Sequence, residues 1–536
     1  MRRSWRAAFG ALLLSLVGSW GAAAFAADAA SAPGDLLALG RALYLEGRRA
    51  DGSPLVAGRA GGLLLTGAEA ACANCHRRSG LGGAEGRSYI PPVTGAALFT
   101  AMPAGKGPSA LGDGRPAYAE ASLAHALREG VDASGRKLDF LMPRYRLDDR
   151  EVKALQAWLR ALPQAPVAEA GVLHFATVIA PEVPPERGEA MVGVLQACFE
   201  EHNAGPQPER GRRKLAADMR QREGRKWQLH VWQLQGPQDG WERQLSQRAG
   251  EQPVFALVGG IGRHWQPVHG FCERSGVPCL FPHVDAPVTD PAGFYPLYLG
   301  KGALLEAGLV ARDIAPRAEA RVTQVLREDD AAAEAAAEAL RRALAEQGIA
   351  TRELRIPAQA PLTPGTLAAV QPDDTLMLWL RPADLQRLAA VAPVAAQVYV
   401  SATLAQNDKL PLPEAWKARI LVAYPFELPQ RRAVRIGQLR QWLQANGLAL
   451  SDERVQADAY VACKALRTAM MEAEDHLGPD YLVERLEVNM ERSTATGMYP
   501  RLALGNGQRF ASKTGYLVRI DDRSGGLVPV GERTTP

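Results

Sequence analysis

The chain of 536 residues lacks several features that would assign it to a common class of protein. Only one pair of its six cysteines has the C-x-x-C spacing, so the second pair that a zinc ribbon requires is missing. After residue 26 no stretch of about 18 uncharged apolar residues occurs, so no membrane-spanning helix is expected there. The sequence contains no nucleotide or flavin fingerprint and no pairing of a nucleophile with a base, which argues against an enzyme.

The sequence also lacks a marked excess of charge of either sign. Its formal net charge is +4, and it falls to +1 without the first 26 residues, which hold three arginines and no acidic residue. A nearly neutral protein offers no electrostatic basis for binding nucleic acid. About 510 residues are too many for a single hydrophobic core, so two or three domains are expected.

The N-terminal segment predicts export from the cytoplasm. Arg2, Arg3 and Arg6 precede the apolar run AAFGALLLSLVGSW, and the small residues of Ala24-Phe25-Ala26 suit signal peptidase. We therefore expect residues 1–26 to be a cleaved signal peptide and the mature protein to be periplasmic and soluble. An uncleaved N-terminal anchor is the alternative.

One short motif carries specific chemistry, the sequence Cys72-Ala-Asn-Cys75-His76. Thiols at positions i and i+3 lie on one face of a helical turn, within reach of the two vinyl groups of one porphyrin. C-x-x-C-H is the attachment signature of c-type haem. The motif predicts one covalent haem c on Cys72 and Cys75, with His76 as an axial ligand of the iron.

A second axial ligand is expected on the other side of the haem, and a methionine there raises the reduction potential. Met142 is the favoured candidate because it lies on a loop between two amphipathic helical patterns, followed by Pro143. Met102, in a loop rich in glycine and proline, is the second candidate. His125, in the middle of a predicted helix, is more typical of a surface or packing residue.

These segments resemble a class I, mono-haem cytochrome c domain. The resemblance covers residues 35–163 and rests on GDLLALGRALYLEG, the haem motif, REGVDASGRKL, MPRY and the closing helix. It implies an all-α domain in which Cys72 and Cys75 form the thioethers. It also implies that His76 and Met142 are the axial pair. Similar cytochrome domains accompany periplasmic dehydrogenases.

The remainder of the chain changes pattern after the Pro/Ala-rich stretch LPQAPVAEAGV. Strand-like runs such as VLHFATVIA, KWQLHVWQL and DTLMLWL alternate with helical segments, one of them expected at 331–347. This alternation predicts parallel, doubly wound sheets, and the length predicts two lobes. The segment LALGNGQRFASKTGYLVRI predicts a closing hairpin around Asn506-Gly507.

The order of these elements resembles the type I periplasmic binding-protein fold of ABC transporters, over roughly residues 172–522. The resemblance rests on EEHNAGP, FALVGGIG with SGVPCLFP after it, and DAYVACKALRTAM. The domain also resembles binding proteins found with quinoprotein alcohol dehydrogenase systems. We therefore expect a signal peptide at 1–26, a cytochrome domain at 33–163, a linker at 164–171, a binding-protein-like domain at 172–522 and a tail at 523–536.

A ligand of such a domain would lie where the carboxyl ends of the strands meet. The candidates are Gly260 and Gly262 in GGIGRHW, whose helix start would favour an anion, His283 and Asp285 in FPHVDAPV, and Ser401 with Thr403 in VYVSATLAQ. The family's amino-acid binders usually carry Ser or Thr where this chain has GGIG. This departure predicts that the cleft is not a standard amino-acid site.

Four cysteines lie outside the haem motif. Cys272 and Cys279 are separated by a short turn and are expected to form a disulfide in an oxidising compartment, with a metal site involving His269 and His283 as the alternative. Cys198 and Cys463 lie on predicted helices, and the sequence leaves open whether they pair.

The leading hypothesis is an electron-transfer protein with a domain that senses a ligand or docks a partner. The expected partners are a periplasmic dehydrogenase or terminal oxidase and a small molecule. The alternative is a solute-binding protein of the ABC-transporter type with an accessory haem. An enzyme that passes electrons from a bound substrate to the haem is the third and least favoured hypothesis.

Overall fold

The computed structural model describes residues 33–59, 61–85, 88–103, 114–162, 171–205, 225–317, 321–406, 410–473, 476–492, 497–521 and 523–536. The predicted signal peptide lies outside these ranges, and so does most of the predicted linker. The chain divides into two compact units. The smaller comprises Met1–Ala71 and Ala119–Trp158, and the larger comprises Cys72–Tyr118 and Leu159–Pro536.

The smaller unit is built from helices and one small sheet. Its elements are α1 (Pro33–Glu46), β1 (Val56–Gly58), β2 (Leu64–Thr66), the 3-10 helix η1 (Gly67–Ala70), α4 (Glu120–Glu129), β5 (Arg144–Tyr145) and the start of α5 (Asp149–Ala161). The strand order β2-β1-β5 is antiparallel throughout. Helix α1 crosses α5 closely at Gly40, where a Cβ atom would lie 2.0 Å from the carbonyl oxygen of Ala154. Only glycine permits this approach, and Tyr44 packs beside Trp158 one turn further along.

The larger unit begins with four short elements, α2 (Ala73–His76), β3 (Gly83–Glu85), β4 (Ser88–Ile90) and α3 (Gly95–Leu98). Strands β3 and β4 form an antiparallel pair. A Cβ atom on Gly95 would lie 2.8 Å from the carbonyl oxygen of Arg160, so α3 packs tightly against the end of α5. Arg160 also covers the ring of Phe99, with 3.9 Å between the guanidinium carbon and the ring centre.

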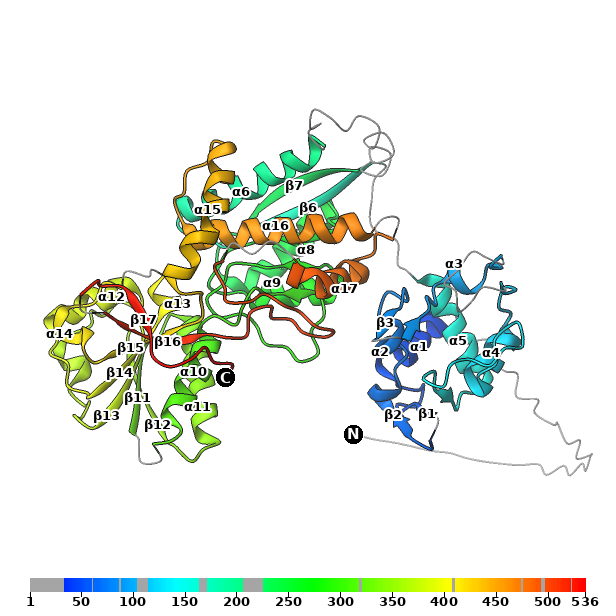
Figure 1. Ribbon diagram of the computed structural model, residues 1–536, viewed down its shortest axis with the longest axis horizontal. Helices are drawn as coiled ribbons and strands as arrows, with labels where there is room; N and C mark the ends of the chain where they lie inside the picture. The colour runs from blue at the N-terminus through cyan, green and yellow to red at the C-terminus, as the bar shows by residue number, and fades with distance from the viewer. Residues whose placement is uncertain are drawn as a thin grey trace, which may run out of the picture. The chain divides into compact units, whose positions relative to one another are not determined.

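A first α/β lobe follows, with five parallel strands in the order β10-β9-β8-β6-β7. Its elements are β6 (Val172–Ile179), α6 (Pro185–Asn203), β7 (Lys226–Gln233), η3 (Gln238–Gly240), α8 (Trp241–Glu251), β8 (Ala256–Val258), α9 (Gln266–Ser275), β9 (Cys279–Leu280) and β10 (Pro296–Leu297). Figure 1 shows α8 and α9 on one face of this sheet and α6 with α16 on the other. Both faces are covered, which explains why β6 is almost wholly buried.

A second α/β lobe contains a seven-stranded sheet in the order β12-β11-β13-β14-β15-β16-β17. Its elements are α10 (Ala303–Ile314), β11 (Arg321–Arg327), α11 (Ala331–Ala345), β12 (Thr351–Ile356), η4 (Pro364–Leu367), β13 (Asp374–Trp379), α12 (Pro382–Arg387), η5 (Leu388–Ala390), β14 (Gln397–Ser401), α13 (Ala402–Ala405), α14 (Glu414–Lys417), β15 (Ile420–Tyr424), β16 (Tyr516–Ile520) and β17 (Leu527–Pro529). The first five strands in this order are parallel to one another. Strand β16 runs antiparallel to both of its neighbours, β15 and β17. Helix α11 begins at the cap residue Asp330 and covers the sheet with alanines.

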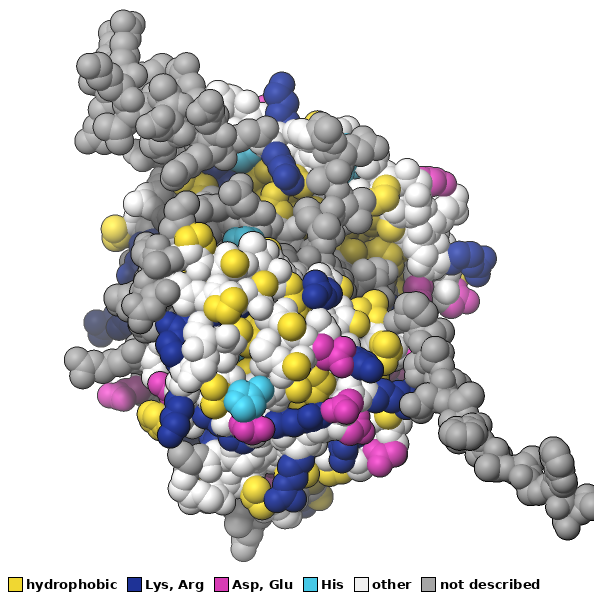
Figure 2. Space-filling view, turned by 90° about the vertical axis from the view of Figure 1, so that its right-hand side faces the viewer, with side chains coloured by type: hydrophobic (Ala, Val, Ile, Leu, Met, Phe, Trp, Pro, Cys, Tyr) yellow, Lys and Arg dark blue, Asp and Glu magenta, His cyan; other side chains and the backbone are white. Residues whose placement is uncertain are grey.

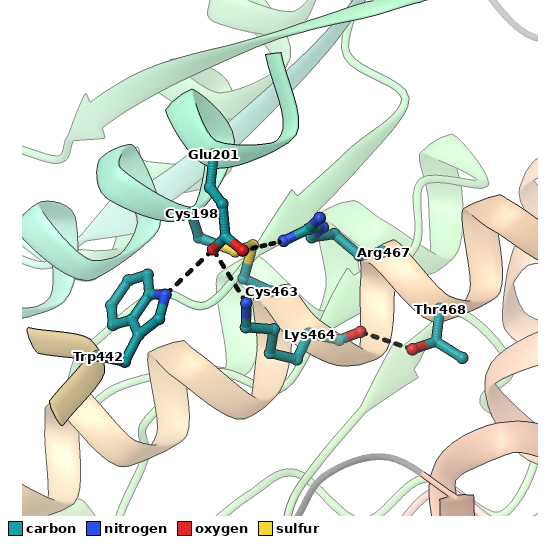
Figure 3. Close-up of a disulfide and its surroundings, with 7 residues drawn as sticks. All are labelled: Cys198, Glu201, Trp442, Cys463, Lys464, Arg467 and Thr468. Atoms are coloured by element: carbon teal, nitrogen blue, oxygen red, sulfur yellow. Dashed lines mark hydrogen bonds and ion pairs between the residues drawn. A yellow bond between two sulfur atoms is a disulfide. The ribbon is translucent and has the colours of Figure 1, made fainter. Parts of the chain in front are cut away.

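Between β15 and β16 the chain returns to the first lobe through α15 (Pro429–Ala445), α16 (Glu453–Ala473), α17 (Pro479–Asn489) and η6 (Met490–Arg492). A disulfide between Cys198 on α6 and Cys463 on α16 joins segments 265 residues apart (Figure 3). Beside it, Glu201 accepts a hydrogen bond from the indole of Trp442 and pairs with Lys464 and Arg467. These polar contacts outweigh the effect of burial and lower the pKa of Glu201 to about 2.

The predicted alternation of strands and helices is confirmed, but the predicted hairpin is wrong. The turn at Asn506-Gly507 closes an irregular loop in which Ala503 donates its N–H to the carbonyl of Ala511, 3.0 Å away. The antiparallel pair is instead formed by β16 with β17, so the sheet continues beyond residue 522. The turn signal was correct, but no apolar alternation flanks it on both sides to support two strands.

No helix among the described residues is long and apolar enough to cross a membrane. On the face shown in Figure 2, Lys and Arg side chains lie among Asp and Glu side chains, with apolar side chains scattered between them. The described residues of this face present no broad patch of one charge, in agreement with the low net charge of the sequence.

Candidate haem-attachment site and ligand cleft

The haem motif occupies a single helical turn. Cys72 caps α2 with helical backbone angles, and its carbonyl oxygen accepts the N–H of His76 at 2.9 Å. Arg77 then ends the turn with φ of 66°, in the left-handed region. Because Cys72 and Cys75 stand three residues apart on this turn, their side chains project from the same face.

His76 is buried and held in one orientation. Its Nδ1 lies 3.0 Å from the carbonyl oxygen of Pro91. A carbonyl can only accept, so Nδ1 carries the proton and Nε2 keeps its lone pair. Burial lowers the pKa of His76, and the bond to Pro91 offsets this only in part. The ring therefore stays neutral near pH 7, with Nε2 as the nitrogen that can bind a metal.

The donor set fits a covalently bound haem. The other four cysteines form the disulfides Cys198–Cys463 and Cys272–Cys279, and neither bond includes a cysteine of the haem motif. Two thiols on one helical face and a neutral imidazole beside them are the groups that thioether attachment and axial ligation require.

Met142 lies on a loop of the smaller unit that two hydrogen bonds hold in place. The carboxylate of Asp139 accepts the N–H of Leu141 at 2.8 Å, and the guanidinium of Arg144 donates to the carbonyl oxygen of Met142. Its side chain is half-buried. Of the alternatives, His125 is 46% exposed on α4 beside Glu129. Met102 exchanges two backbone hydrogen bonds with Arg115.

In the α/β part, a cleft lies where the carboxyl ends of the strands from both lobes meet. Its cavity measures about 40 Å³, and an adjoining one, which shares Arg187, His283 and Asp285, about 50 Å³. Each is large enough for a few water molecules but not for an amino acid. The residues that line the first cavity and that bear charge or hydroxyl groups are Arg187, His283, Asp285, Lys301, Thr403, Arg454, Asp458, Tyr499 and Ser512.

His283 is the centre of a polar chain in the first lobe. The guanidinium of Arg187 donates to Nε2 of His283 at 3.1 Å, and Nδ1 of His283 lies 2.7 Å from the carboxylate of Asp458. Because a guanidinium only donates, Nε2 must accept, which assigns the proton to Nδ1. Asp458 also accepts from the hydroxyl of Tyr499 at 3.1 Å, and Arg187 pairs with Asp452 at 2.8 Å.

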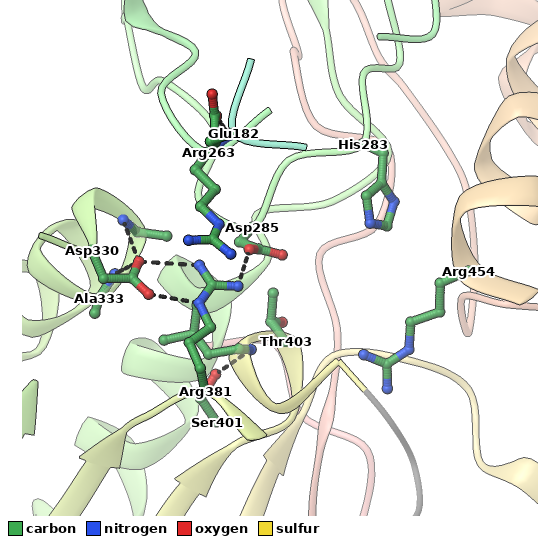
Figure 4. A network of polar contacts seen from close by, with 12 residues as sticks. Glu182, Arg263, His283, Asp285, Asp330, Ala333, Arg381, Ser401, Thr403 and Arg454 are labelled. Atoms are coloured by element: carbon green, nitrogen blue, oxygen red, sulfur yellow. Dashed lines mark hydrogen bonds and ion pairs between the residues drawn. The ribbon is translucent and has the colours of Figure 1, made fainter. Parts of the chain in front are cut away.

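Asp285 and Arg381 connect the two lobes. Arg381 follows β13 in the second lobe and donates to Asp285, which follows β9 in the first, at 2.6 Å (Figure 4). Arg381 is also held by Asp330, the cap of α11, at 2.6 Å. Burial by itself would raise the pKa of Asp285, but the Arg381 guanidinium outweighs it and holds this pKa below its usual value. Both groups are therefore charged, and the pair closes the cleft.

The glycines of GGIG do not form the expected anion site. Helix α9 begins only at Gln266, and three of the four backbone N–H groups of this segment already have partners. Gly259 donates to Leu280 at 2.8 Å, Gly260 to the sulfur of Met191 at 3.2 Å, and Ile261 to Val178 at 2.9 Å.

The glycines are required for packing instead. A Cβ atom on Gly260 would lie 2.6 Å from the ring of Trp265, and one on Gly262 would lie 2.8 Å from Ala180. Gly262 lines the adjoining cavity, whereas Gly260 lines neither of the two cavities.

Of the remaining candidates, Thr403 lines the cleft and Ser401 does not. The hydroxyl of Ser401 accepts the N–H of Leu404 at 3.0 Å and donates to the buried carboxyl of Glu306. Thr403 contacts the same carboxyl through its N–H and its hydroxyl, both at 2.8 Å. Burial raises the pKa of Glu306 to about 7, although these hydrogen bonds act in the opposite direction.

The structure also bears on Cys272 and Cys279, which were expected to form either a disulfide or, with His269 and His283, a metal site. The structure contains a disulfide between Cys272 and Cys279. His269 faces Tyr298, with Nδ1 2.9 Å from the hydroxyl oxygen, and His283 belongs to the cleft. No group of three or more His, Cys, Asp or Glu residues able to hold a metal ion occurs among the described residues.

The sequence did not reveal the charged residues that close the cleft, among them Arg187, Arg381 and Asp458. Their segments show no distinctive motif, and their partners lie between 41 and 265 residues away. One signal was available for Arg381, which lies two residues after the buried strand β13, because strand ends line clefts in this class of fold.

Comparisons with known proteins agree with this description. Residues 66–163 match the family model of cytochrome c. The structure is similar to an ABC transporter substrate-binding protein of Aeropyrum pernix, with a TM-score of 0.50 and 14% identity, over 68% of this chain and 96% of that one. A solute-binding protein of Rhodopseudomonas palustris BisB5, in complex with 3,4-dihydroxybenzoic acid, has a TM-score of 0.49 and 12% identity, over 68% and 98%. A comparison with curated protein sequences finds no match.

The predicted architecture is confirmed. The chain joins a cytochrome c domain to an α/β domain with the two-lobed fold of type I periplasmic binding proteins.

Proposed function

We propose that the protein is an exported single-electron carrier with one covalent haem c. The orientation of His76 is the observation that carries this proposal, because its Nδ1 is committed to Pro91 and its Nε2 is left for iron, directly beside two thiols. A bound haem supplies one chemical competence, the uptake and release of a single electron. Cys72 and Cys75 would hold the macrocycle by thioethers, with Met142 as second axial ligand. The expected partner is a periplasmic dehydrogenase or terminal oxidase.

Replacing Met142 by alanine is expected to lower the reduction potential by about 0.1 V or more, since axial ligands alone shift haem potentials over a range of about 0.8 V. The sulfur-to-iron charge-transfer absorption should disappear at the same time. The measurement is a spectroelectrochemical titration of the full-length, haem-loaded chain. Met102→Ala is the matched control and should leave both properties unchanged. If Met102→Ala removes the absorption and Met142→Ala does not, the assignment is reversed.

The binding-protein domain is proposed to sense a small ligand or to dock the redox partner. A second candidate function, an ABC-transporter-type solute-binding protein with an accessory haem, is favoured by the closed cleft and the charged pair Arg381–Asp285 that joins its lobes. A redox titration with and without candidate small molecules separates the two. A shift of the haem reduction potential on addition of a ligand would show that ligand binding and electron transfer are coupled, and would support the first candidate. Ligand binding without any shift would favour the second candidate.

The cleft is further predicted to reject the common amino acids. A ligand carboxylate enters such a site only if charge-assisted hydrogen bonds replace its water. The GGIG segment offers no hydroxyl, and the N–H groups of Gly259, Gly260 and Ile261 are already engaged. Each hydrogen bond lost to a charged group costs about 1.5–3 kcal/mol, or roughly a factor of 10 to 100 in affinity. Calorimetry of the full-length protein should detect no micromolar binding. Micromolar binding of any common amino acid would contradict this prediction and favour the transporter function.

A further inference from the structure

The three residues that follow His76 contact helix α17 of the binding-protein fold, and the innermost contact is a buried carboxyl group. Ser79 donates its backbone N–H to one carboxyl oxygen of Glu484 at 2.9 Å and its hydroxyl to the other at 2.6 Å. Ser79 is 3% exposed and Glu484 is 6% exposed. A carboxyl group in this position is removed from water and has only the haem-motif loop as its hydrogen-bond donor among the contacts described.

The two arginines before Ser79 extend this contact to both sides. Arg77 lies 3.5 Å from the carboxylate of Glu487, one turn along α17, and Glu487 is itself paired with the buried Arg509. The guanidinium of Arg78 covers the ring of Phe294 at 4.2 Å. Arg77, Arg78 and Ser79 therefore each contact a residue outside the loop. These contacts hold the loop that follows His76 against the α/β fold.

Glu484 lines neither cavity of the cleft, and its hydrogen-bond donor Ser79 lies three residues after His76. Burial raises the pKa of Glu484 to about 7. The two bonds from Ser79 and the charge of Arg77 act against this rise, and Asp480 adds to it. The other charged or titratable groups around the contact are Arg78 on the loop, Glu487 on α17, Glu273 on α9, and Tyr295 and Arg509 on the adjoining segments.

We propose that Glu484 is the proton site linked to the haem: its carboxyl group binds one proton when the iron held by His76 gains one electron, and releases that proton on oxidation. This inference rests on the proposed function as an electron carrier. The electron comes from a one-electron donor, such as the periplasmic redox partner or a chemical reductant, and the proton comes from solvent. Added negative charge at the haem disfavours a carboxylate in a low-dielectric contact. The coupling is reciprocal, so protonation of Glu484 in turn favours reduction.

The test is a spectroelectrochemical titration of the full-length, haem-loaded protein from about pH 5 to about pH 9. The wild-type potential should fall as pH rises through about 7, because ionised Glu484 stabilises the oxidised haem. Glu484→Gln should remove this step and hold the potential at the wild-type value of low pH, since the amide imitates the protonated carboxyl. Ser79→Ala removes a donor to the carboxylate and should move the step to higher pH.

The matched control is Glu491→Gln. Glu491 carries an exposed carboxyl group just beyond α17, and its replacement should keep the wild-type profile. A Glu484→Gln profile that overlies the wild type overturns the proposal, and so does a wild-type potential that is constant over this range. If Glu484→Gln does not fold, a redox-difference infrared spectrum of the wild type must show a protonated carboxyl appearing on reduction, and its absence also overturns the proposal. A chain that attaches no haem overturns the proposed function itself, whereas a haem-loaded chain without the step overturns this inference alone.

Discussion

Replacing Cys72 and Cys75 together by serine is expected to give an exported chain with no covalent haem and no one-electron titration. The two thioethers are the only covalent links predicted between haem and protein, and a serine hydroxyl cannot form a thioether. The intact mass of the wild type should exceed that of the processed apoprotein by one haem, and the variant should lose this excess completely. Denaturing electrophoresis followed by haem staining gives a second measurement of the same loss.

The matched control is Cys272→Ala with Cys279→Ala, which also removes two sulfur atoms from the chain. This control should keep the covalent haem, since neither residue belongs to the motif. Expression must take place where haem-attachment machinery is active. A wild-type product without haem under those conditions would contradict the prediction, and so would a haem that remains covalently bound to the serine variant.

The haem motif could be predicted from the sequence because its chemistry is local. Five consecutive residues hold both thiols and the imidazole, and one helical turn suffices to align them. The carbonyl of Pro91 that orients His76 could not be predicted, because it lies 15 residues further along in an irregular segment. The assignment of Met142 rests on helical periodicity to either side of its loop and stays a prediction.

The strands of the α/β part were predictable for a similar reason. A strand buried on both faces is a short apolar run, as β6 and β13 are, and such runs stand out between helical segments. The role of the GGIG segment could not be inferred in the same way. Its glycines follow a strand, as those of an anion site do, but they are needed because Trp265 packs against Gly260 and Gly262.

The contacts that close the cleft were beyond the reach of sequence patterns. Asp285 and Arg381 each follow a strand, but they are 96 residues apart, and no sequence pattern indicates that they pair with each other. The same holds for Ser79 and Glu484, which are separated by 405 residues. A pattern of spacing describes one helix or strand, whereas these contacts depend on how elements pack in three dimensions.

Removing the Cys198–Cys463 disulfide, by alanine at both positions, is expected to cost up to about 5 kcal/mol of unfolding free energy. The bond closes a loop across 265 residues and connects α6, near the start of the α/β part, with α16, near its end. Its main effect is to restrict the unfolded chain, and that restriction increases with the length of the closed loop. The contacts of Glu201 with Trp442, Lys464 and Arg467 would remain and hold the two helices together in the folded state (Figure 3).

The second disulfide of the same α/β part supplies the matched control for this prediction. Cys272 and Cys279 are only seven residues apart, so their removal should cost about half as much, roughly 2.5 kcal/mol. All four cysteines are buried, so both double variants lose sulfur atoms of similar burial, and the difference between them isolates loop length. Guanidinium unfolding of the full-length chain, followed by tryptophan fluorescence, measures both losses. Equal losses, or a larger loss for the short loop, would show that the long-range bond acts through its local contacts rather than through the unfolded chain.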